Sequence, residues 1–167
     1  MLALITGASS GIGRDMARIL NSYNYDVIIT ARNEEKLKEL KEELENKNNN
    51  KVYMYLADLS KEEECINLYK KVKEEHGFID LLINNAGFGL CGKIIDTDLE
   101  TEMKMIDTNI KAVHILTKMF LKDMVEKNRG NILNVASVAS FMAGPLMATY
   151  YATKNYILRF SQAIREE

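Results

Sequence analysis

Short apolar runs alternate with amphipathic segments along the chain. The runs at residues 2–6, 26–31, 51–57, 81–84 and 131–136 are rich in aliphatic side chains, and each precedes a helical pattern or its start. Such short runs predict five strands, because a strand buried on both faces reads as continuously apolar. Strands that alternate with helices are typical of a parallel sheet covered on both faces. We therefore predict an α/β protein with a doubly wound parallel sheet in a three-layer α/β/α arrangement.

Helix start and stop signals lie between these runs. One helix is expected to begin about Ile12. Ser60 and Glu63 have the spacing of a capping box, which predicts a helix start there. His76-Gly77 is typical of a helix end, with the imidazole near the negative end of the helix dipole.

Two further helices are predicted from their periodicity. One is expected to place Leu37, Leu40 and Leu44 on a single buried face. A long helix is expected over residues 99–127, and its periodicity places Asn109 on a largely apolar, inward face.

The composition is that of one globular domain. Hydrophobic residues make up 47% of the chain, and 22 basic residues nearly balance 24 acidic ones, so no nucleic-acid partner is expected. No apolar stretch approaches the roughly 18 residues of a membrane span, so no membrane partner is expected. Cys65 and Cys91 lack the spacing of metal ligands, and no metal site is predicted. Unpaired cysteines are typical of a cytoplasmic protein.

A glycine-rich segment, Thr6–Gly13, follows the first apolar run and opens a helical pattern. This is the context of a βα turn that binds a nucleotide. Glycines at 7, 11 and 13 allow a sharp turn, bring backbone N–H groups close to a pyrophosphate and let the helix pack tightly on the strand. The G-x-x-x-G-x-G spacing differs from the common G-x-G-x-x-G pattern, so a tight loop without a ligand stays an alternative at this point.

Tyr150 and Lys154 carry the candidate chemistry. They lie four residues apart in a segment that reads as helical from about Ala148, so both side chains share one face. A lysine ammonium near a tyrosine hydroxyl stabilises the phenolate and prepares it for proton transfer near neutral pH. Tyr151 has Asn155 four residues later, so only Tyr150 has a lysine partner. Ser137 follows the last apolar run, where open α/β sheets bind their ligands.

Together these motifs resemble the short-chain dehydrogenase/reductase family. The resemblance covers nearly the whole chain and keeps the family's order through residues 6–13, Asn84-Asn85-Ala86-Gly87, Asn109, Ser137 and Tyr150-x-x-x-Lys154. It implies a Rossmann-like fold, a single NAD(P)-binding domain over residues 1–167, and hydride transfer between a nicotinamide cofactor and a small-molecule carbonyl or alcohol substrate. Which carbonyl compound that is cannot be predicted from these motifs.

The resemblance implies a catalytic role for four residues. Tyr150 is the expected general acid and base at the substrate oxygen, and Ser137 is expected to orient and polarise that oxygen. Lys154 is expected to assist Tyr150 and to hold the nicotinamide ribose. Asn109 is expected to hold a water that connects Lys154 to solvent. Asn84 either contributes to this region or only stabilises the central sheet.

The second predicted strand ends at Ala31, where NAD-preferring folds usually carry an acidic residue. No carboxylate is present there to repel a 2′-phosphate, and the next residue, Arg32, can neutralise one. NADP(H) is therefore favoured over NAD(H), although Arg32 is also consistent with a solvated residue at a helix entry. The residues expected to bind the cofactor are Gly7, Ser9, Ser10, Gly11, Ile12, Gly13, Arg32, Asp58, Leu59, Asn85, Ala86, Gly87, Tyr150 and Lys154.

Members of the family run to about 250 residues, so the resemblance predicts a chain that is incomplete at its C-terminus and lacks the last strands of the fold. The apolar run at 131–136 is then expected to form a sheet edge. A truncated, non-catalytic nucleotide-binding fragment stays an alternative to an active enzyme. The resemblance also implies a homodimer or homotetramer, formed by the long helix of Asn109 and the helix of Tyr150.

Overall fold

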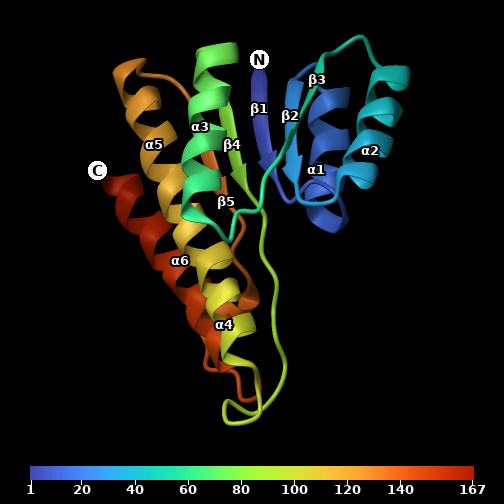
Figure 1. The fold of residues 1–167 in the computed structure, drawn as a ribbon. Coiled ribbons are helices and arrows are strands. Elements are labelled where there is room, and N and C mark those ends of the chain that lie inside the picture. Colours follow the sequence, from blue (N-terminus) through green and yellow to red (C-terminus); the bar gives the residue numbers. More distant parts are fainter.

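The computed structural model describes residues 1–167 as a parallel five-stranded sheet with the strand order β3-β2-β1-β4-β5 (Figure 1). The strands are β1 (Leu2–Thr6), β2 (Asp26–Ala31), β3 (Val52–Leu56), β4 (Leu81–Asn84) and β5 (Asn131–Asn134). The predicted ranges match three of these strands residue for residue. The predicted third and fifth strands were too long, because pairing ends at Leu56 and at Asn134.

Six α-helices connect and cover the strands. They are α1 (Gly11–Ser22), α2 (Glu34–Lys47), α3 (Glu62–His76), α4 (Leu99–Ile106), α5 (Ala112–Glu126) and α6 (Ala148–Glu166). A π-helical segment, η1 (Asp107–Lys111), joins α4 to α5, and a short 3₁₀ helix, η2 (Val138–Phe141), follows β5. No helix is long and apolar enough to cross a membrane.

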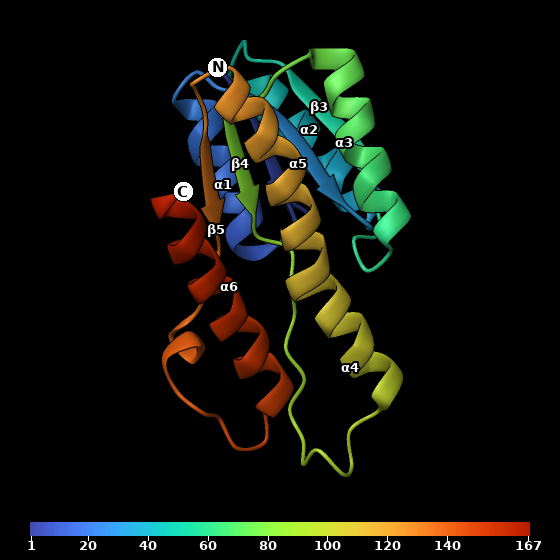
Figure 2. The same ribbon diagram turned by 90° about the vertical axis from the view of Figure 1, so that its left-hand side faces the viewer.

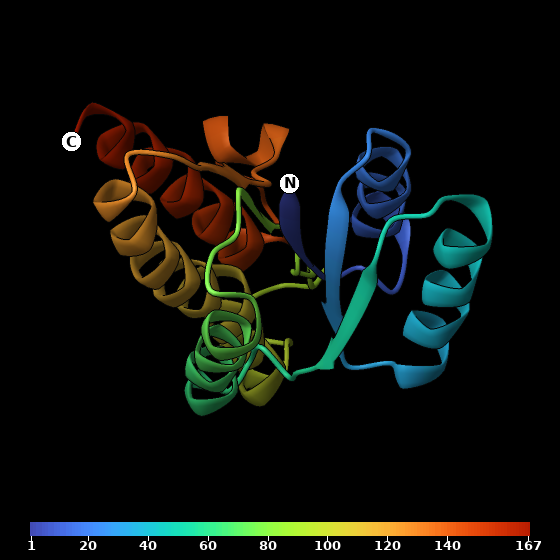
Figure 3. The same ribbon diagram turned by 90° about the horizontal axis from the view of Figure 1, so that it is seen from above.

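The helices form two layers with the sheet between them, as predicted. Figure 3 shows α1 and α2 on one face, and α3, α5 and α6 on the other. Two buried clusters fill the interfaces. The predicted leucines of α2, Leu37, Leu40 and Leu44, belong to the first cluster. Leu116 and Phe120 of α5 belong to the second. Burial of these apolar faces stabilises each layer by about 25 cal/mol per Å² of apolar surface.

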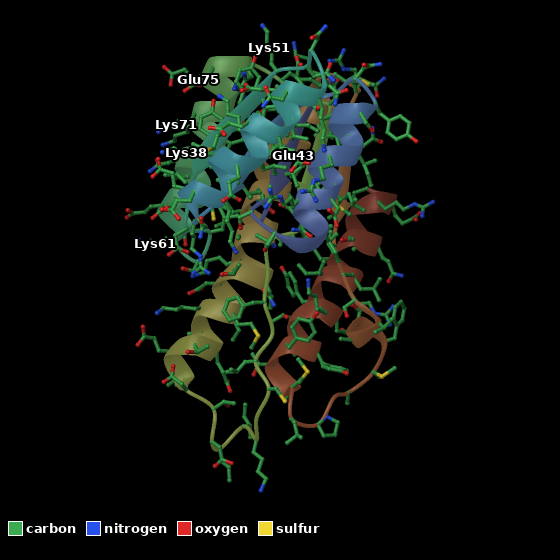
Figure 4. The ribbon with its side chains drawn as sticks, turned by 90° about the vertical axis from the view of Figure 1, so that its right-hand side faces the viewer. Lys38, Glu43, Lys51, Lys61, Lys71 and Glu75 are labelled. Carbon is green, nitrogen blue, oxygen red and sulfur yellow. The ribbon has the colours of Figure 1, made fainter.

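An ionic contact joins the two helices of the first layer. Glu43 of α2 points toward α1, as Figure 4 shows, and its carboxylate accepts hydrogen bonds from Arg18 Nε at 2.9 Å and Nη2 at 2.8 Å. These bonds and one from Lys47 lower the pKa of Glu43 to about 2. The forked geometry orients α2 on α1.

The chain reverses its winding direction at the centre of the sheet. β1 pairs with β2 on one side and with β4 on the other. The chain therefore adds β2 and β3 on one side of β1, and then β4 and β5 on the other side. Such a switch point opens a crevice at the carboxyl ends of the strands. Below that end, α4 and the first turns of α6 project beyond the sheet with their connecting loops (Figure 2).

Two local predictions need correction, and one is confirmed. Ser60 and Glu63 form no capping box, because α3 begins only at Glu62, and the Ser60 hydroxyl donates to Asp58 Oδ1 at 2.8 Å. The helix over 99–127 is not uniform, since it contains the π-helical turn. β5 is a sheet edge, as predicted, and Leu133 on this strand is 43% exposed.

Candidate functional site

A cleft of about 910 Å³ lies at the carboxyl ends of the strands. It runs from the glycine-rich turn after β1 to the first turns of α6, and thus joins the predicted nucleotide site to the predicted catalytic residues. The predicted residues that line it are Gly7, Ser9, Ser10, Ile12, Arg32, Asp58, Leu59, Asn85, Ala86, Gly87, Ser137, Tyr150 and Lys154. Gly11, Gly13 and Asn109 do not line the cleft.

The glycine turn is tightly packed against the end of β4. Gly7 has a φ of +67°, and a Cβ atom there would lie 2.8 Å from Ala86 Cα. A Cβ atom on Gly13 would lie 2.5 Å from the carbonyl oxygen of Gly7. α1 begins at Gly11, and no side chain caps its first backbone N–H groups. An uncapped helix N-terminus is a suitable place for an anionic phosphate.

Alanine substitutions separate crowding from backbone strain in this turn. Gly7→Ala should lower the free energy of unfolding by about 2–4 kcal/mol, because it adds a steric overlap to an unfavourable φ. Gly11 has a similar φ of +53° but open space around it, so Gly11→Ala should cost about 1–2 kcal/mol. Urea denaturation of both variants measures the difference. Equal losses would show that Ala86 yields to the added methyl group.

Thr6 fixes the two central strands at the floor of the cleft, a role that sequence analysis did not identify. Its buried hydroxyl accepts hydrogen bonds from the backbone N–H groups of Asn85 at 2.9 Å and Ala86 at 3.0 Å. The Asn85 amide donates to the carbonyl oxygen of Thr6 at 3.0 Å. Thr6 had a signal in the sequence, because a threonine at the end of an apolar strand needs a polar partner.

Asn84 belongs to a buried polar network on the far side of β4. Its Nδ2 donates to Thr117 Oγ1 at 3.0 Å and to Asn134 Oδ1 at 2.8 Å, and Asn134 in turn donates to Ser161 Oγ at 2.9 Å. The network connects β4, β5, α5 and α6. Asn84 does not line the cleft, and of its two predicted roles the geometry favours the structural one.

Arg32 and Asp58 both line the far end of the cleft, where β2 and β3 end. Burial raises the pKa of Asp58, but hydrogen bonds from Ser60 and the positive charges of Arg32 and Lys61 outweigh it, so the pKa is lowered. The backbone N–H of Asp58 donates to Glu64 Oε2 at 2.6 Å. Asp58 is therefore an ionised acceptor, and Arg32 is a cation beside it at the cleft wall.

Tyr150 and Lys154 lie one turn apart on α6, as predicted. Lys154 is 7% exposed, its Nζ donates to the carbonyl oxygen of Val135 at 2.8 Å, and burial lowers its pKa. The Lys154 Nζ is 6.0 Å from the centroid of the Tyr150 ring. Gly89 lies against that ring, because a Cβ atom there would be 3.2 Å from Tyr150 Cδ2. Ser137 lines the same part of the cleft.

Asn109 lies in the π-helical turn and is 1% exposed, in agreement with its predicted inward face. Its Nδ2 donates to the Phe88 carbonyl at 2.9 Å and to Thr153 Oγ1 at 3.1 Å, and its Oδ1 accepts from the Phe88 N–H at 3.0 Å. The amide thus holds the segment after β4 against α6. Sequence analysis predicted neither this role nor that of Thr153, and π-helical turns are frequent at functional sites.

Apolar side chains lie along the segment between β5 and α6, and two of them, Val138 and Met147, line the cleft. Val138, Phe141, Met142 and Leu146 are all more than half exposed. Leu146 has a φ of +67°, rare for a branched residue, and its carbonyl oxygen accepts a hydrogen bond from Gly92 at 2.7 Å. No group of three or more His, Cys, Asp or Glu residues is placed to hold a metal ion.

Comparison with known proteins gives one consistent result. A family model described as short chain dehydrogenase matches residues 1–167. An uncharacterized oxidoreductase of Staphylococcus saprophyticus is 33% identical over 166 residues, which cover 99% of this chain and 71% of that protein.

Two solved structures are similar in fold and sequence. A short-chain dehydrogenase from Sphingobium yanoikuyae in complex with NADPH has a TM-score of 0.92 at 31% identity, over 98% of this chain and 63% of that one. A metagenomic short-chain oxidoreductase in complex with NADP has a TM-score of 0.94 at 31% identity, over 99% and 75% of the two chains.

Proposed function

The chain belongs to the short-chain dehydrogenase family, and from this premise we propose that it is an oxidoreductase that transfers a hydride between NADP(H) and a carbonyl or alcohol substrate. The observation that carries the proposal is the single cleft that joins the glycine turn to Ser137, Tyr150 and Lys154. Carbonyl-dependent oxidation of NADPH by the purified chain, followed by absorbance, tests it directly.

A bound nicotinamide would supply the hydride. Tyr150 donates its hydroxyl proton to the substrate oxygen, and in the reverse direction its phenolate accepts the proton of the alcohol. Ser137 donates a hydrogen bond to the same oxygen. The Lys154 ammonium stabilises the resulting phenolate electrostatically. Asn109 holds the wall behind Lys154 through Phe88 and Thr153.

The residues of the nucleotide end fit a dinucleotide phosphate. Gly7 packs closely against Ala86, so the turn has no side chain at this point. The backbone N–H groups at the uncapped start of α1 are then available to bind the pyrophosphate. Arg32 is the cation at the end of β2, where Ala31 provides no carboxylate, and this pair supports NADP(H) over NAD(H). The NADPH and NADP of the two similar structures add support.

Removal of the Arg32 guanidinium should weaken NADPH binding selectively. Arg32→Ala should raise the Kd for NADPH about 10- to 100-fold, because one or two charge-assisted hydrogen bonds to the 2′-phosphate are lost. The Kd for NADH should stay unchanged. Calorimetric titration with each cofactor measures both values, and higher salt should reduce the difference. Lys36→Ala, which removes an exposed cation in the first turn of α2, is the control. Equal weakening of both cofactors would contradict the assignment.

The turnover assay also distinguishes a second candidate function, a nucleotide-binding chain without activity. The chain spans 71% of the staphylococcal relative and 63% of the Sphingobium protein. A nucleotide-binding chain without turnover would bind NADPH in the titration and show no carbonyl-dependent oxidation of it. The apolar side chains of Val138 and Met147 in the cleft support an uncharged, apolar substrate for an active enzyme.

We also propose a homo-oligomer that uses α4, α5 and α6. Leu99 and Met103 of α4 are exposed, and His114, Tyr156 and Phe160 form an aromatic stack on the outer side of α5 and α6. Exposed apolar and aromatic side chains of this kind are typical of protein interfaces.

Cys65 and Cys91 are free thiols, which supports a reducing, cytoplasmic location.

A further inference from the structure

The short turn that carries Ser137 is built around a second serine. Ser137 caps η2, and its Oγ accepts from the backbone N–H of Ala139 at 3.1 Å. Ser140 closes the other half of a capping box, because its Oγ accepts from the backbone N–H of Ser137 at 3.3 Å. The local bonds hold the turn in shape, but they do not place it relative to α6.

Ser140 also bonds to the helix of the predicted catalytic pair. It is fully buried, and its hydroxyl donates to the carbonyl oxygen of Lys154 at 2.8 Å. The side chain of Asn155 donates to the carbonyl oxygen of Ser140 at 2.8 Å. One buried residue therefore connects the Ser137 backbone to the two residues at positions 154 and 155 of α6.

We infer that Ser140 is a positioning residue that sets the place of Ser137 relative to Tyr150 and Lys154, with Asn155 as its partner. A buried hydroxyl that both donates and accepts has one favoured orientation, so it transmits the position of the α6 backbone to the turn. Lys154 Nζ reinforces the same connection through Val135. The catalytic part of this inference rests on the proposed function.

Hydrogen exchange tests the connection in the resting chain. Ser140→Ala should make the peptide over residues 135–142 exchange about fivefold faster, because the bonds of its hydroxyl to the Ser137 N–H and to the Lys154 carbonyl are both lost. Asn155→Asp should also accelerate exchange of this peptide, since the isosteric carboxylate cannot donate a hydrogen bond to the Ser140 carbonyl oxygen. Asn155 is exposed, so this variant folds even if the buried change does not. Unchanged exchange in the folded variants would overturn the inference.

Ser161→Ala is the matched control. Like Ser140→Ala it removes one hydroxyl, but from α6 instead of η2, and its partner is Asn134 on β5. Exchange of residues 135–142 should stay at the wild-type rate in this variant. Acceleration equal to that of Asn155→Asp would contradict the assignment, because any weakening of α6 would then loosen the turn.

A double-mutant cycle tests the catalytic consequence. Ser140→Ala should lower kcat about 10- to 100-fold, because misplacing a reacting group by about 1 Å has an effect of this size. The Kd for NADPH should stay unchanged. In a Ser137→Ala background the same change should have no further effect on kcat, because the group that it positions is absent. Independent, multiplicative losses would overturn the positioning role. Wild-type turnover tests the proposed function separately, and the exchange result stands whatever that turnover is.

Discussion

Tyr150→Phe is expected to lower kcat for carbonyl-dependent NADPH oxidation by about 10²- to 10⁴-fold, the usual contribution of a general acid. The change removes only the hydroxyl, so the substrate oxygen would receive the hydride with no proton donor beside it. The phenyl ring should keep its packing, because Gly89 contacts the ring and not the hydroxyl. The Kd for NADPH should therefore change less than about twofold, a shift below 0.5 kcal/mol. Steady-state kinetics and calorimetric titration measure the two effects separately.

The adjacent tyrosine provides the control for that experiment. Tyr151 is 6.1 Å from Tyr150 between ring centroids, and its ring packs on Gly144. Tyr151→Phe removes the same atom from the next residue and should leave kcat near the wild-type value. Turnover by Tyr150→Phe at the wild-type rate would exclude Tyr150 as the acid. Equal losses in both variants would show a general effect of the two hydroxyls on α6.

The strand pattern could be predicted from the sequence because a strand that is buried on both faces is a continuous apolar run. β1, β2 and β4 are central or long strands, and their apolar runs match their observed ends. β3 and β5 are the two edges, where pairing stops earlier than the apolar run does. Tertiary pairing, and not residue preference, decides where an edge strand ends.

The side-chain partners at the site could be predicted only in part. The Tyr150 and Lys154 spacing is local to one helix, so periodicity was sufficient to place both on one face. Asn109 bonds to Phe88 and Thr153, which lie 21 and 44 residues away. Such bonds depend on how helices pack, and one sequence carries no record of that packing. At Ser60 a local pattern gave a wrong prediction. The capping-box spacing predicted a bond to the start of a helix, but the Ser60 hydroxyl donates to Asp58 instead.

Lys154→Met is expected to lower kcat about 10²-fold or more and, at neutral pH, to raise the stability of the fold. The activity falls because the variant has no ammonium to stabilise the developing phenolate of Tyr150. The stability rises because Lys154 is a buried cation whose only hydrogen bond is to a neutral carbonyl, that of Val135. Methionine has a similar shape without the charge. A residue that lowers stability and supports turnover in this way is typical of active sites.

The pH dependence of stability gives the sharper result. Burial lowers the pKa of Lys154 below its ordinary value of 10.5, so between these two values the unfolded chain binds the proton more tightly than the folded one. Wild-type stability from this group must then increase with pH in that window, because unfolding takes up a proton there. The advantage of Lys154→Met should be largest near neutral pH and shrink as the pH approaches 10.5. Thermal unfolding at a series of pH values measures it.

Lys73 is the control of opposite sign. Its Nζ donates to Asp123 Oδ1 at 2.6 Å, and the hydrogen bonds to Asp123 and Tyr69 raise its pKa. The folded chain holds this proton more tightly, so the stabilisation is present below the ordinary pKa of 10.5 and is lost as the pH rises through the raised pKa. Lys73→Met should therefore destabilise the fold at neutral pH. A loss of stability in Lys154→Met equal to that in Lys73→Met would show that the bond to Val135 outweighs the burial of the charge. Lys154 would then be a structural anchor of α6 as much as a catalytic cation.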